Sequence, residues 1–227
     1  MLQSLIKKFR GNDYAIDNNI PKAYLFNLFL GKLISLCYGM LYLRTLNIVF
    51  ICPSSTIKVK SKFLGGNRIQ IGPRCYIDAL SMEGIICGKN VSIGRNTTII
   101  VTGSLRQLGK GITIGNNVGL GTHGFFGGAG GLEIGDDTIF GNYVSVHPEN
   151  HNYNNPLIPI RLQGVNHKGI KIGKGCWIGA KATILDGTII GDGCIVAAGA
   201  VVSGKFPDNV IIGGVPAKII KNRFPAE

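Results

Sequence analysis

Acidic residues, tryptophan and paired cysteines are scarce in this chain of 227 residues. It has 12 Asp and Glu, one Trp, and six Cys that form no CxxC pair and no zinc-ligand spacing, which argues against a zinc finger or a thioredoxin-like redox motif. No secretory signal with a cleavage site is recognisable, and a chain this long and apolar needs no disulfides to fold. We therefore expect reduced thiols and a cytoplasmic location.

The scarcity of acidic residues leaves a formal net charge of +12, because the chain has 24 Lys and Arg. Residues 1–62 hold nine of these basic residues against Asp13 and Asp17. Such a chain attracts anions such as nucleic acid, acidic lipid or a phosphorylated small molecule. It contains no RNA-binding aromatic motif, zinc-finger spacing or heptad zipper, so we do not expect nucleic acid as a partner.

Residues 1–56 form a basic and apolar region in which we expect helices. Residues 1–10, MLQSLIKKFR, predict a short amphipathic helix, and residues 22–51 are strongly apolar apart from three basic residues. The longest uncharged run there is residues 33–43, which is shorter than the about 20 residues that span a bilayer. Two interpretations stay open: a helical cap packed on the main domain, or peripheral contact with the inner face of the membrane.

Glycine is abundant, with 34 residues, about double its usual share of about 7%. From residue 57 it alternates with short Ile and Val segments, and one aliphatic residue recurs every six positions: Ile172, Ile178, Ile184, Ile190, Val196 and Val202. Three such hexads make one triangular coil whose aliphatic residues point inward, and coils must stack because a single coil buries no core. The sequence therefore predicts an all-β, parallel β-helix over residues 57–210.

Two of the cysteines fit the same repeat. Cys176 and Cys194 lie one coil apart, at the position of each hexad that holds a small residue. A buried free cysteine behaves as a small apolar side chain. We therefore predict that both are stacked core residues without a redox role.

The strict spacing breaks at residues 103–111, 121–131 and 147–169, where we expect loops. The longest break, 147–169, carries three prolines, which cannot join a strand ladder. A long polar loop extruded from a regular solenoid is the usual place for function. After the last coil, residues 211–227 form a tail, in which residues 216–223 predict a short helix that begins at a proline.

The C-terminal third of the chain carries a family resemblance. Residues 170–202 read IKIGKGCWIGAKATILDGTIIGDGCIVAAGAVV, and residues 207–223 read PDNVIIGGVPAKIIKNR. With these segments the chain resembles the hexapeptide-repeat acyltransferases, in particular the sugar and polysaccharide O-acetyltransferases, over roughly residues 65–223. The resemblance implies a left-handed β-helix, acetyl-CoA as donor, a saccharide hydroxyl as acceptor, no required metal, and a homotrimer with active sites between neighbouring subunits.

Acetyl transfer from a thioester to a hydroxyl needs a base, and a neutral histidine near pH 7 suits that role. In the resembled family the base lies in the extruded loop. His151, 26 residues before Trp177, is therefore our first candidate, and His147 is the second. His123, on an earlier coil, is either an acceptor-binding residue or a turn residue, and we expect His167 to be a solvated loop residue.

The resemblance also predicts which residues hold coenzyme A. The positions that match the family's motif are Ala180, Ala198, Ser203, Gly204, Lys218 and Lys221. Relatives usually have Thr-Lys where this chain has Ser203 and Gly204, and Lys205, which follows at once, is the expected substitute. The lysines would meet the phosphates of the cofactor through their charge.

Three alternatives stay open. An N-acetyltransferase that acts on an amino sugar would use the same base and cofactor. A carbonic anhydrase of the γ class, which has the same fold, needs three histidines converging on zinc, but His123 lies 24 residues before His147, which is not a multiple of the coil length. A non-catalytic scaffold at a membrane, or a subunit of a polysaccharide assembly complex, would explain the basic and apolar residues 1–56.

Overall fold

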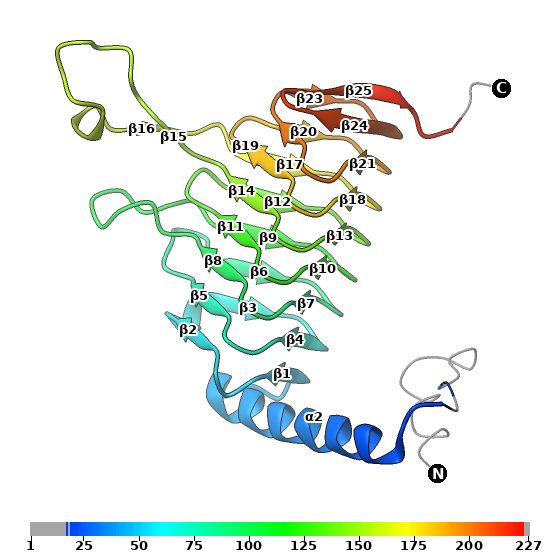
Figure 1. The fold of residues 1–227 in the computed structure, drawn as a ribbon. Coiled ribbons are helices and arrows are strands. Elements are labelled where there is room, and N and C mark those ends of the chain that lie inside the picture. Colours follow the sequence, from blue (N-terminus) through cyan, green and yellow to red (C-terminus); the bar gives the residue numbers. More distant parts are fainter. Residues whose placement is uncertain (1–16, 18, 225–227) are drawn as a thin grey trace.

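The hexad repeats wind the chain into a stack of triangular coils (Figure 1). The structure is a computed structural model that describes residue 17 and residues 19–224. Strands from successive coils pair in parallel and build three sheets, which we call sheets A, B and C. The prediction of an all-β, left-handed parallel β-helix is confirmed, and one helix, α2 (Lys22–Leu43), lies across the end of the stack that starts with the first coil.

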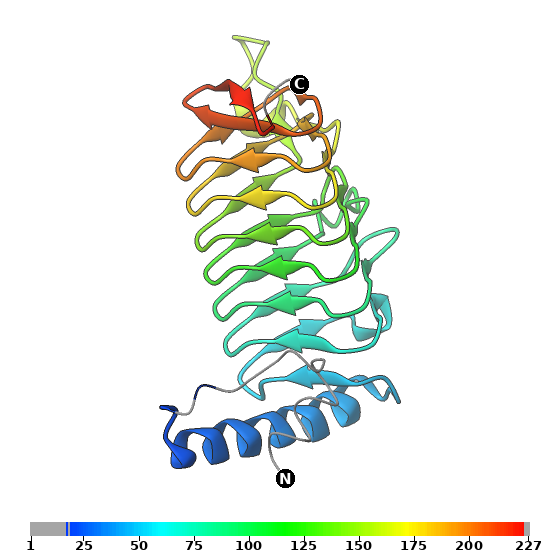
Figure 2. The same cartoon turned by 90° about the vertical axis from the view of Figure 1, so that its right-hand side faces the viewer.

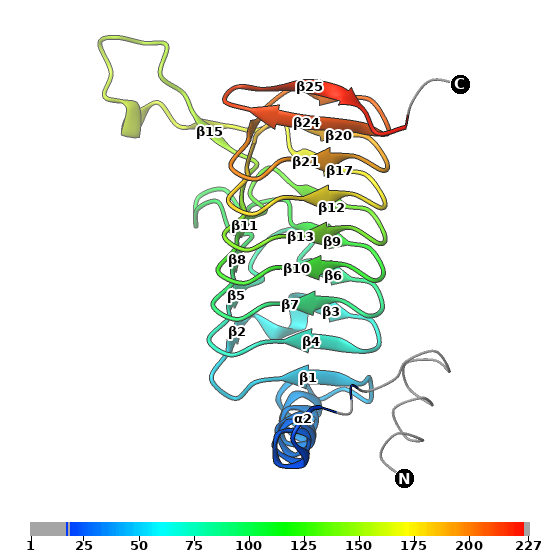
Figure 3. The same ribbon diagram turned by 45° about the vertical axis from the view of Figure 1, so that its right-hand side comes forward.

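Each coil contributes one short strand to each sheet, and Figure 3 shows the strands of sheet A stacked along the axis. In spatial order, sheet A contains β1 (Val49–Ile51), β4 (Ile69–Ile71), β7 (Ser92–Ile93), β10 (Gly119–Leu120), β13 (Ile139–Phe140), β18 (Trp177–Ile178), β21 (Ile195–Val196), β24 (Val210–Gly214) and β25 (Ala217–Asn222). Sheet B contains β2 (Thr56–Lys58), β5 (Tyr76–Asp78), β8 (Thr98–Ile100), β11 (Phe125–Gly127), β14 (Ser145–His147), β19 (Thr183–Leu185) and β22 (Val201–Val202). Sheet C contains β3 (Phe63–Gly65), β6 (Ile85–Cys87), β9 (Ile112–Ile114), β12 (Leu132–Ile134), β17 (Ile170–Ile172), β20 (Ile189–Ile190) and β23 (Lys205–Phe206).

The core is a set of aliphatic columns inside the prism. In sheet C, Ile134 pairs in register with Ile114 on one neighbouring coil and with Ile172 on the other, and all three side chains are buried. The residue between the buried pair of each strand faces outward, as Glu133 does. Each added coil therefore extends the same columns, and the stacking removes their apolar surface from water.

Small polar residues and cysteines line the corners between sheets. The hydroxyl of Thr138 donates a hydrogen bond to the carbonyl oxygen of Gly173 at 2.8 Å, and the thiol of Cys176 donates to the carbonyl oxygen of Gly191 at 3.2 Å. Cys176 and Cys194 are both buried, as predicted, and burial raises the pKa of the Cys176 thiol to about 11. These thiols serve as compact corner residues that hydrogen-bond to the next coil.

Glycine follows the strands of sheets A and C where the backbones of adjacent coils approach most closely. A Cβ atom on Gly135 would lie 2.6 Å from the carbonyl carbon of Gly173, and one on Gly141 would lie 2.6 Å from the backbone nitrogen of Ala180. Real Cβ atoms do not come this close to backbone, so the glycines that follow these strands of sheets A and C are required by the distance between coils.

Helix α2 covers the open end of the first coil (Figure 2). Gly39 is its buried residue and packs against the backbone of Val49, where a Cβ atom would not fit. The hydroxyl of Tyr42 donates to the carbonyl oxygen of Ile57 at 3.2 Å and lies 3.1 Å from the Ile57 backbone nitrogen, which donates to it. The interpretation of this region as a helical cap therefore fits the contacts.

Most of α2 nevertheless remains exposed. The most apolar window of 18 residues in this 22-residue helix has a mean hydropathy of 1.4, and 6% of that window is buried, so by length and composition the helix is apolar enough to cross a membrane. Phe26 is 65% exposed and Leu41 is 78% exposed. The packing of α2 on the coils thus accounts for one side of the helix only.

The predicted C-terminal helix over residues 216–223 is wrong, because this segment forms strand β25. It turns back and pairs antiparallel with β24, with Lys218 opposite Gly213 and Lys221 opposite Ile211. The last coil leaves an unpaired edge on sheet A, and a strand can satisfy that edge whereas a helix of eight residues is marginal in isolation.

The other boundaries differ in detail. The β-helix begins at β1, inside the predicted helical region 1–56, because the β-branched run around Val49 forms a strand rather than the end of a helix. The expected loop at 121–131 contains β11, whereas 103–111 is a loop as predicted. The helix predicted at residues 1–10 lies outside the described residues.

We predict that Gly135→Ala destabilises the protein by about 1–3 kcal/mol, because the added methyl group must push two coils apart. Gly31→Ala is the matched control, since a Cβ atom there meets nothing within 4 Å and alanine favours a helix. Chemical unfolding followed by circular dichroism measures both. Equal stability of the two variants would contradict the role assigned to the glycine columns.

Candidate functional site

Two loops leave the prism at the corner between sheets B and C, on the same side of the molecule (Figure 1). The first joins β8 to β9, and the second, longer loop joins β14 to β17. Because the strands on either side of each loop keep their register with neighbouring coils, both loops are inserted without disturbing the core. The predicted extruded loop at residues 147–169 is the larger of the two.

The long loop is braced by its own hydrogen bonds. Strands β15 (Asn150–His151) and β16 (Val165–Asn166) pair antiparallel at its base, and a 3-10 turn, η2 (Ile160–Leu162), lies further out. The side-chain amide of Gln163 donates to the carbonyl oxygens of Asn155 and Ile158 at 2.8 and 2.6 Å. The loop therefore has a defined shape.

Asp186 fixes the point where the long loop returns to the coils. Its carboxylate accepts hydrogen bonds from the backbone N–H groups of Lys168 and Gly169, both at 2.9 Å. Asp186 follows β19, one coil beyond the loop. A carboxylate that accepts two backbone N–H bonds makes a strong anchor, because charge-assisted hydrogen bonds exceed neutral ones in strength.

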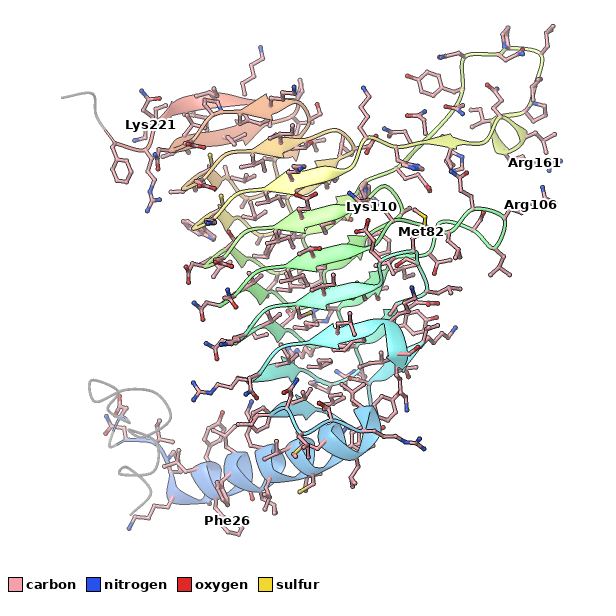
Figure 4. The ribbon with its side chains drawn as sticks, turned by 180° about the vertical axis from the view of Figure 1, so that it is seen from behind. Phe26, Met82, Arg106, Lys110, Arg161 and Lys221 are labelled. Carbon is pink, nitrogen blue, oxygen red and sulfur yellow. The ribbon has the colours of Figure 1, made fainter. Side chains whose placement is uncertain are left out.

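The two loops enclose a cavity of about 550 Å³. His151 and His167 line it from the long loop, together with Glu149 and Arg161, and Arg106 lines it from the shorter loop. Figure 4 shows Arg106 and Arg161 at the outer ends of the two loops. The first candidate for the catalytic base thus lies in a cavity large enough for a small ligand, and so does His167, which we had expected to be only a solvated loop residue.

His147 lies at the root of the long loop, at the end of β14 on the outer face of sheet B. Its Nε2 atom is 2.6 Å from the hydroxyl of Ser145, and its ring stacks on Phe125 with 5.1 Å between ring centroids. Partial burial lowers the pKa of the His147 imidazole below its ordinary value. This keeps the imidazole neutral near pH 7, as a general base requires.

His123 lies at the corner between sheets A and B, away from the two loops. It adopts a left-handed turn conformation with φ of 59°, and its Nε2 atom is 2.7 Å from the side-chain nitrogen of Asn96. Its Nδ1 atom is 3.1 Å from the hydroxyl of Thr122, and its ring stacks on Tyr143. With both nitrogens engaged, His123 fits a turn residue better than an acceptor-binding residue.

The residues predicted to bind coenzyme A fall at three places around the last coils. Ala180 and Ala198 are on successive coils at the corner between sheets A and B, where the carbonyl oxygen of Ala180 accepts a bond from Gly199. Ser203 and Gly204 lie on the other side of sheet B, between β22 and β23, and Lys205 is the first residue of β23. His147 pairs with Leu185, so Ala180 lies one coil beyond His147. Ala198, Ser203 and Gly204 lie two coils beyond it.

Lys218 and Lys221 are on β25 at the end of sheet A, and both are exposed. Lys218 lies opposite Gly213. A Cβ atom on Gly213 would lie 3.1 Å from the Cβ atom of Ala197, which is at the corner between sheets A and B. Lys221 lies opposite Ile211, toward the corner with sheet C. The structure therefore brings Lys218 nearer than Lys221 to the predicted alanines.

Residue 17 and residues 19–224 contain no group of three or more His, Cys, Asp or Glu side chains arranged to hold a metal ion. His123 and His147, two of the three histidines considered for a zinc site, have separate hydrogen-bond and stacking partners. The geometry thus gives no support to a carbonic anhydrase of the γ class.

Four residues of the site, Arg106, Arg161, Glu149 and Asp186, are absent from those predicted from the sequence. The arginines are far apart in the chain, and no repeat position marks them. Asp186 sits beside Gly187 and looks like an ordinary turn residue. Of these four residues only Asp186 could have been predicted from the sequence, because a carboxylate one coil beyond a long insertion is well placed to bind the end of the inserted loop.

Comparison with known proteins agrees with the repeat and the fold. The family profile of the bacterial transferase hexapeptide, with six repeats, matches residues 169–204. WbbJ of Escherichia coli (strain K12), which is named as a lipopolysaccharide biosynthesis O-acetyltransferase, is 34% identical over 140 residues that cover 58% of this chain and 71% of WbbJ. This chain belongs to the hexapeptide-repeat acetyltransferases.

Other relatives match shorter parts of their own length. Rv3034c of Mycobacterium tuberculosis, named as an acetyltransferase, is 36% identical over 60% of this chain and 43% of the relative. The galactoside O-acetyltransferase of Escherichia coli (strain K12) is 32% identical over 40% of this chain and 43% of the relative. The chain therefore spans less than half of these two proteins.

Among solved structures, AntD is similar in fold. AntD is an N-acyltransferase from Bacillus cereus, and the crystal structure of a point mutant of AntD with dTDP and coenzyme A has a TM-score of 0.55 and 23% identity, covering 78% of this chain and 82% of AntD. The complex with dTDP and 3-hydroxybutyryl-CoA gives the same TM-score with 24% identity, over 78% of this chain and 80% of AntD. At this identity the likeness concerns the fold alone.

Proposed function

We propose that this acetyltransferase moves an acetyl group from acetyl-CoA to a hydroxyl of a saccharide, either a surface polysaccharide or a sugar precursor. The observation that carries the proposal is the cavity between the two loops, which is lined by His151. The names of WbbJ and of the galactoside O-acetyltransferase support a sugar hydroxyl as acceptor. The coenzyme A bound to AntD supports an acyl-CoA donor.

In the proposed reaction the imidazole of His151 takes the proton of the acceptor hydroxyl as its oxygen attacks the thioester carbonyl. The new C–O bond forms, the C–S bond breaks, and the proton passes from the imidazolium to the leaving thiolate. The attack is direct and needs no acyl-cysteine. Burial raises the pKa of the thiols of Cys75, Cys87, Cys176 and Cys194, which makes them poor nucleophiles.

We predict that His151→Ala lowers kcat by about 100-fold or more, because general-base catalysis contributes about that much. Transfer of labelled acetyl from acetyl-CoA to a panel of nucleotide sugars, free sugars and extracted glycans measures it. The affinity of His151→Ala for coenzyme A, measured by calorimetry, stays unchanged. His123→Ala, which removes an imidazole at a turn outside this cavity, is the matched control and keeps most of the activity.

Loss of activity in His147→Ala together with full activity in His151→Ala would contradict the assignment. In that case the plot of kcat/KM against pH would show its acidic pKa below 6.5, since burial lowers the pKa of His147 from that ordinary value. The product also separates the two acceptor classes. An O-acetyl ester is released by mild alkali, whereas the amide made by an N-acetyltransferase resists it.

A homotrimer is part of the proposal. Ile139 and Trp177 pair on adjacent strands of sheet A, and each is 52% exposed in the single chain. Large exposed apolar side chains that adjoin one another are typical of protein contacts. We predict a sedimentation mass three times the 24.2 kDa of the chain and a lower mass for Trp177→Ser. A monomer at micromolar concentration would contradict it.

Contact with an anionic membrane surface is the last part of the proposal. The outer side of α2, at the end of the coil stack, exposes apolar side chains such as Phe26 and Leu41. Basic residues flank it, and the ammonium group of Lys60 lies 3.4 Å from the ring centroid of Tyr42 on α2. An apolar helix beside lysines suits the interface of an acidic bilayer. Since α2 also packs on the first coil, an orientation in the plane of the membrane fits these contacts.

We predict that the protein floats with vesicles of phosphatidylcholine and phosphatidylglycerol and not with phosphatidylcholine alone. Replacing Phe26 and Phe29 by Ser reduces flotation, because both are exposed apolar side chains on α2. Leu105→Ser, at a residue 88% exposed on the loop after β8, is the control and leaves flotation unchanged. Failure of the protein to float with anionic vesicles would contradict this orientation. So would retention of the protein on the vesicles after a wash with alkaline carbonate, because a helix that spans the bilayer resists such extraction.

A further inference from the structure

The cavity between the two loops presents two guanidinium groups that have no partner among the residues that the structure describes. Arg106 comes from the shorter loop and Arg161 from η2 of the longer loop, and both line the cavity. Among residue 17 and residues 19–224, neither side chain forms a hydrogen bond or an ion pair. Glu149 is the acidic residue of the lining and does not pair with either arginine.

Both arginines sit on braced backbone. Ser104 and Gln107 exchange backbone hydrogen bonds of 3.0 and 3.2 Å, which close a tight turn around Arg106. On the long loop, Gln163 bonds to the carbonyl oxygens of Asn155 and Ile158 and so holds the turn that carries Arg161. Arg106 and Arg161 are therefore carried by separate, hydrogen-bonded turns of the two loops that line one cavity.

An arginine presents a planar set of N–H donors that matches phosphate, and two such groups facing one cavity supply two positive charges. Both arginine side chains are exposed, and a neutral sugar would offer neither of them an ionic partner. A doubly charged phosphate would balance them, which makes a phosphorylated ligand the best match for this lining.

We propose that Arg106 and Arg161 bind a phosphate group of the acceptor, so that the enzyme acts on a phosphorylated saccharide. This inference rests on the proposed function, since it assigns the cavity to the acceptor. The phosphates of the donor are expected elsewhere, because the lysines predicted to meet them, Lys205 and Lys218, are near the end of the coil stack and do not line this cavity. His151 lines the same cavity and would face the hydroxyl to be acetylated.

Calorimetric titration with glucose 1-phosphate, with glucose and inorganic phosphate as comparisons, tests the inference without requiring turnover. We expect glucose 1-phosphate to bind more tightly than either comparison. The Kd of glucose 1-phosphate should rise about tenfold or more in Arg106→Gln and in Arg161→Gln, since each change removes one guanidinium group that binds the phosphate. Arg95→Gln, which removes the same charge at a position outside the cavity, should leave the Kd unchanged.

Four outcomes would overturn the inference. Glucose 1-phosphate could bind no more tightly than glucose, which would exclude a phosphate site. Inorganic phosphate could bind as tightly as glucose 1-phosphate, which would exclude a saccharide site. The two arginine variants could bind as the unaltered protein does. Lastly, the variants could lose coenzyme A while keeping glucose 1-phosphate, which would assign the arginines to the donor.

Failure of the proposed function is a separate result. If glucose 1-phosphate binds through both arginines but no acceptor receives an acetyl group, the phosphate site stands and the acetyl transfer to saccharides does not. If acetyl transfer proceeds equally well on neutral sugars in the unaltered protein and in both variants, the proposed function stands and the phosphate site does not.

Discussion

At the glycine columns the backbones of neighbouring coils lie so close that a single Cβ atom on Gly135 would meet Gly173 at 2.6 Å. This spacing lets the inward columns around Ile134 and Ile172 pack without gaps, and it lets the corner hydroxyls and thiols reach the next coil. Each coil is stable only on its neighbour. The rigidity of the whole prism, and hence the positions of its corners, follows from that close approach.

The residues of the candidate site lie on two inserted loops, whereas the coils provide the buried core. The loops after β8 and β14 leave at one corner, and the strands that follow them resume their register, so the insertions cost the core little. Asp186 and Gln163 then hold the longer loop through hydrogen bonds to backbone. A cavity made by two inserted segments can therefore change its lining without changing the fold.

The two ends of the stack are closed by different means. Helix α2 covers the first coil through Gly39 and Tyr42, whereas β25 pairs along the edge left by β24. Solenoids need such caps because each terminal coil exposes apolar columns and unpaired backbone groups. The cap at the start also presents an apolar outer side, which links the closure of the prism to the proposed membrane contact.

The coil could be predicted from the sequence, because the aliphatic residues that stack in the core, such as Ile172 and Ile178, recur every six positions along the chain. The long loop and the burial of Cys176 could be predicted in the same way. The strand at residues 216–223 could not, because it pairs with an edge of β24 that is open only since β24 is the last coil strand of sheet A. Only the tertiary structure likewise brought Arg106 to the cavity that holds His151, because contacts between two inserted loops depend on their paths in space and leave no period in the sequence.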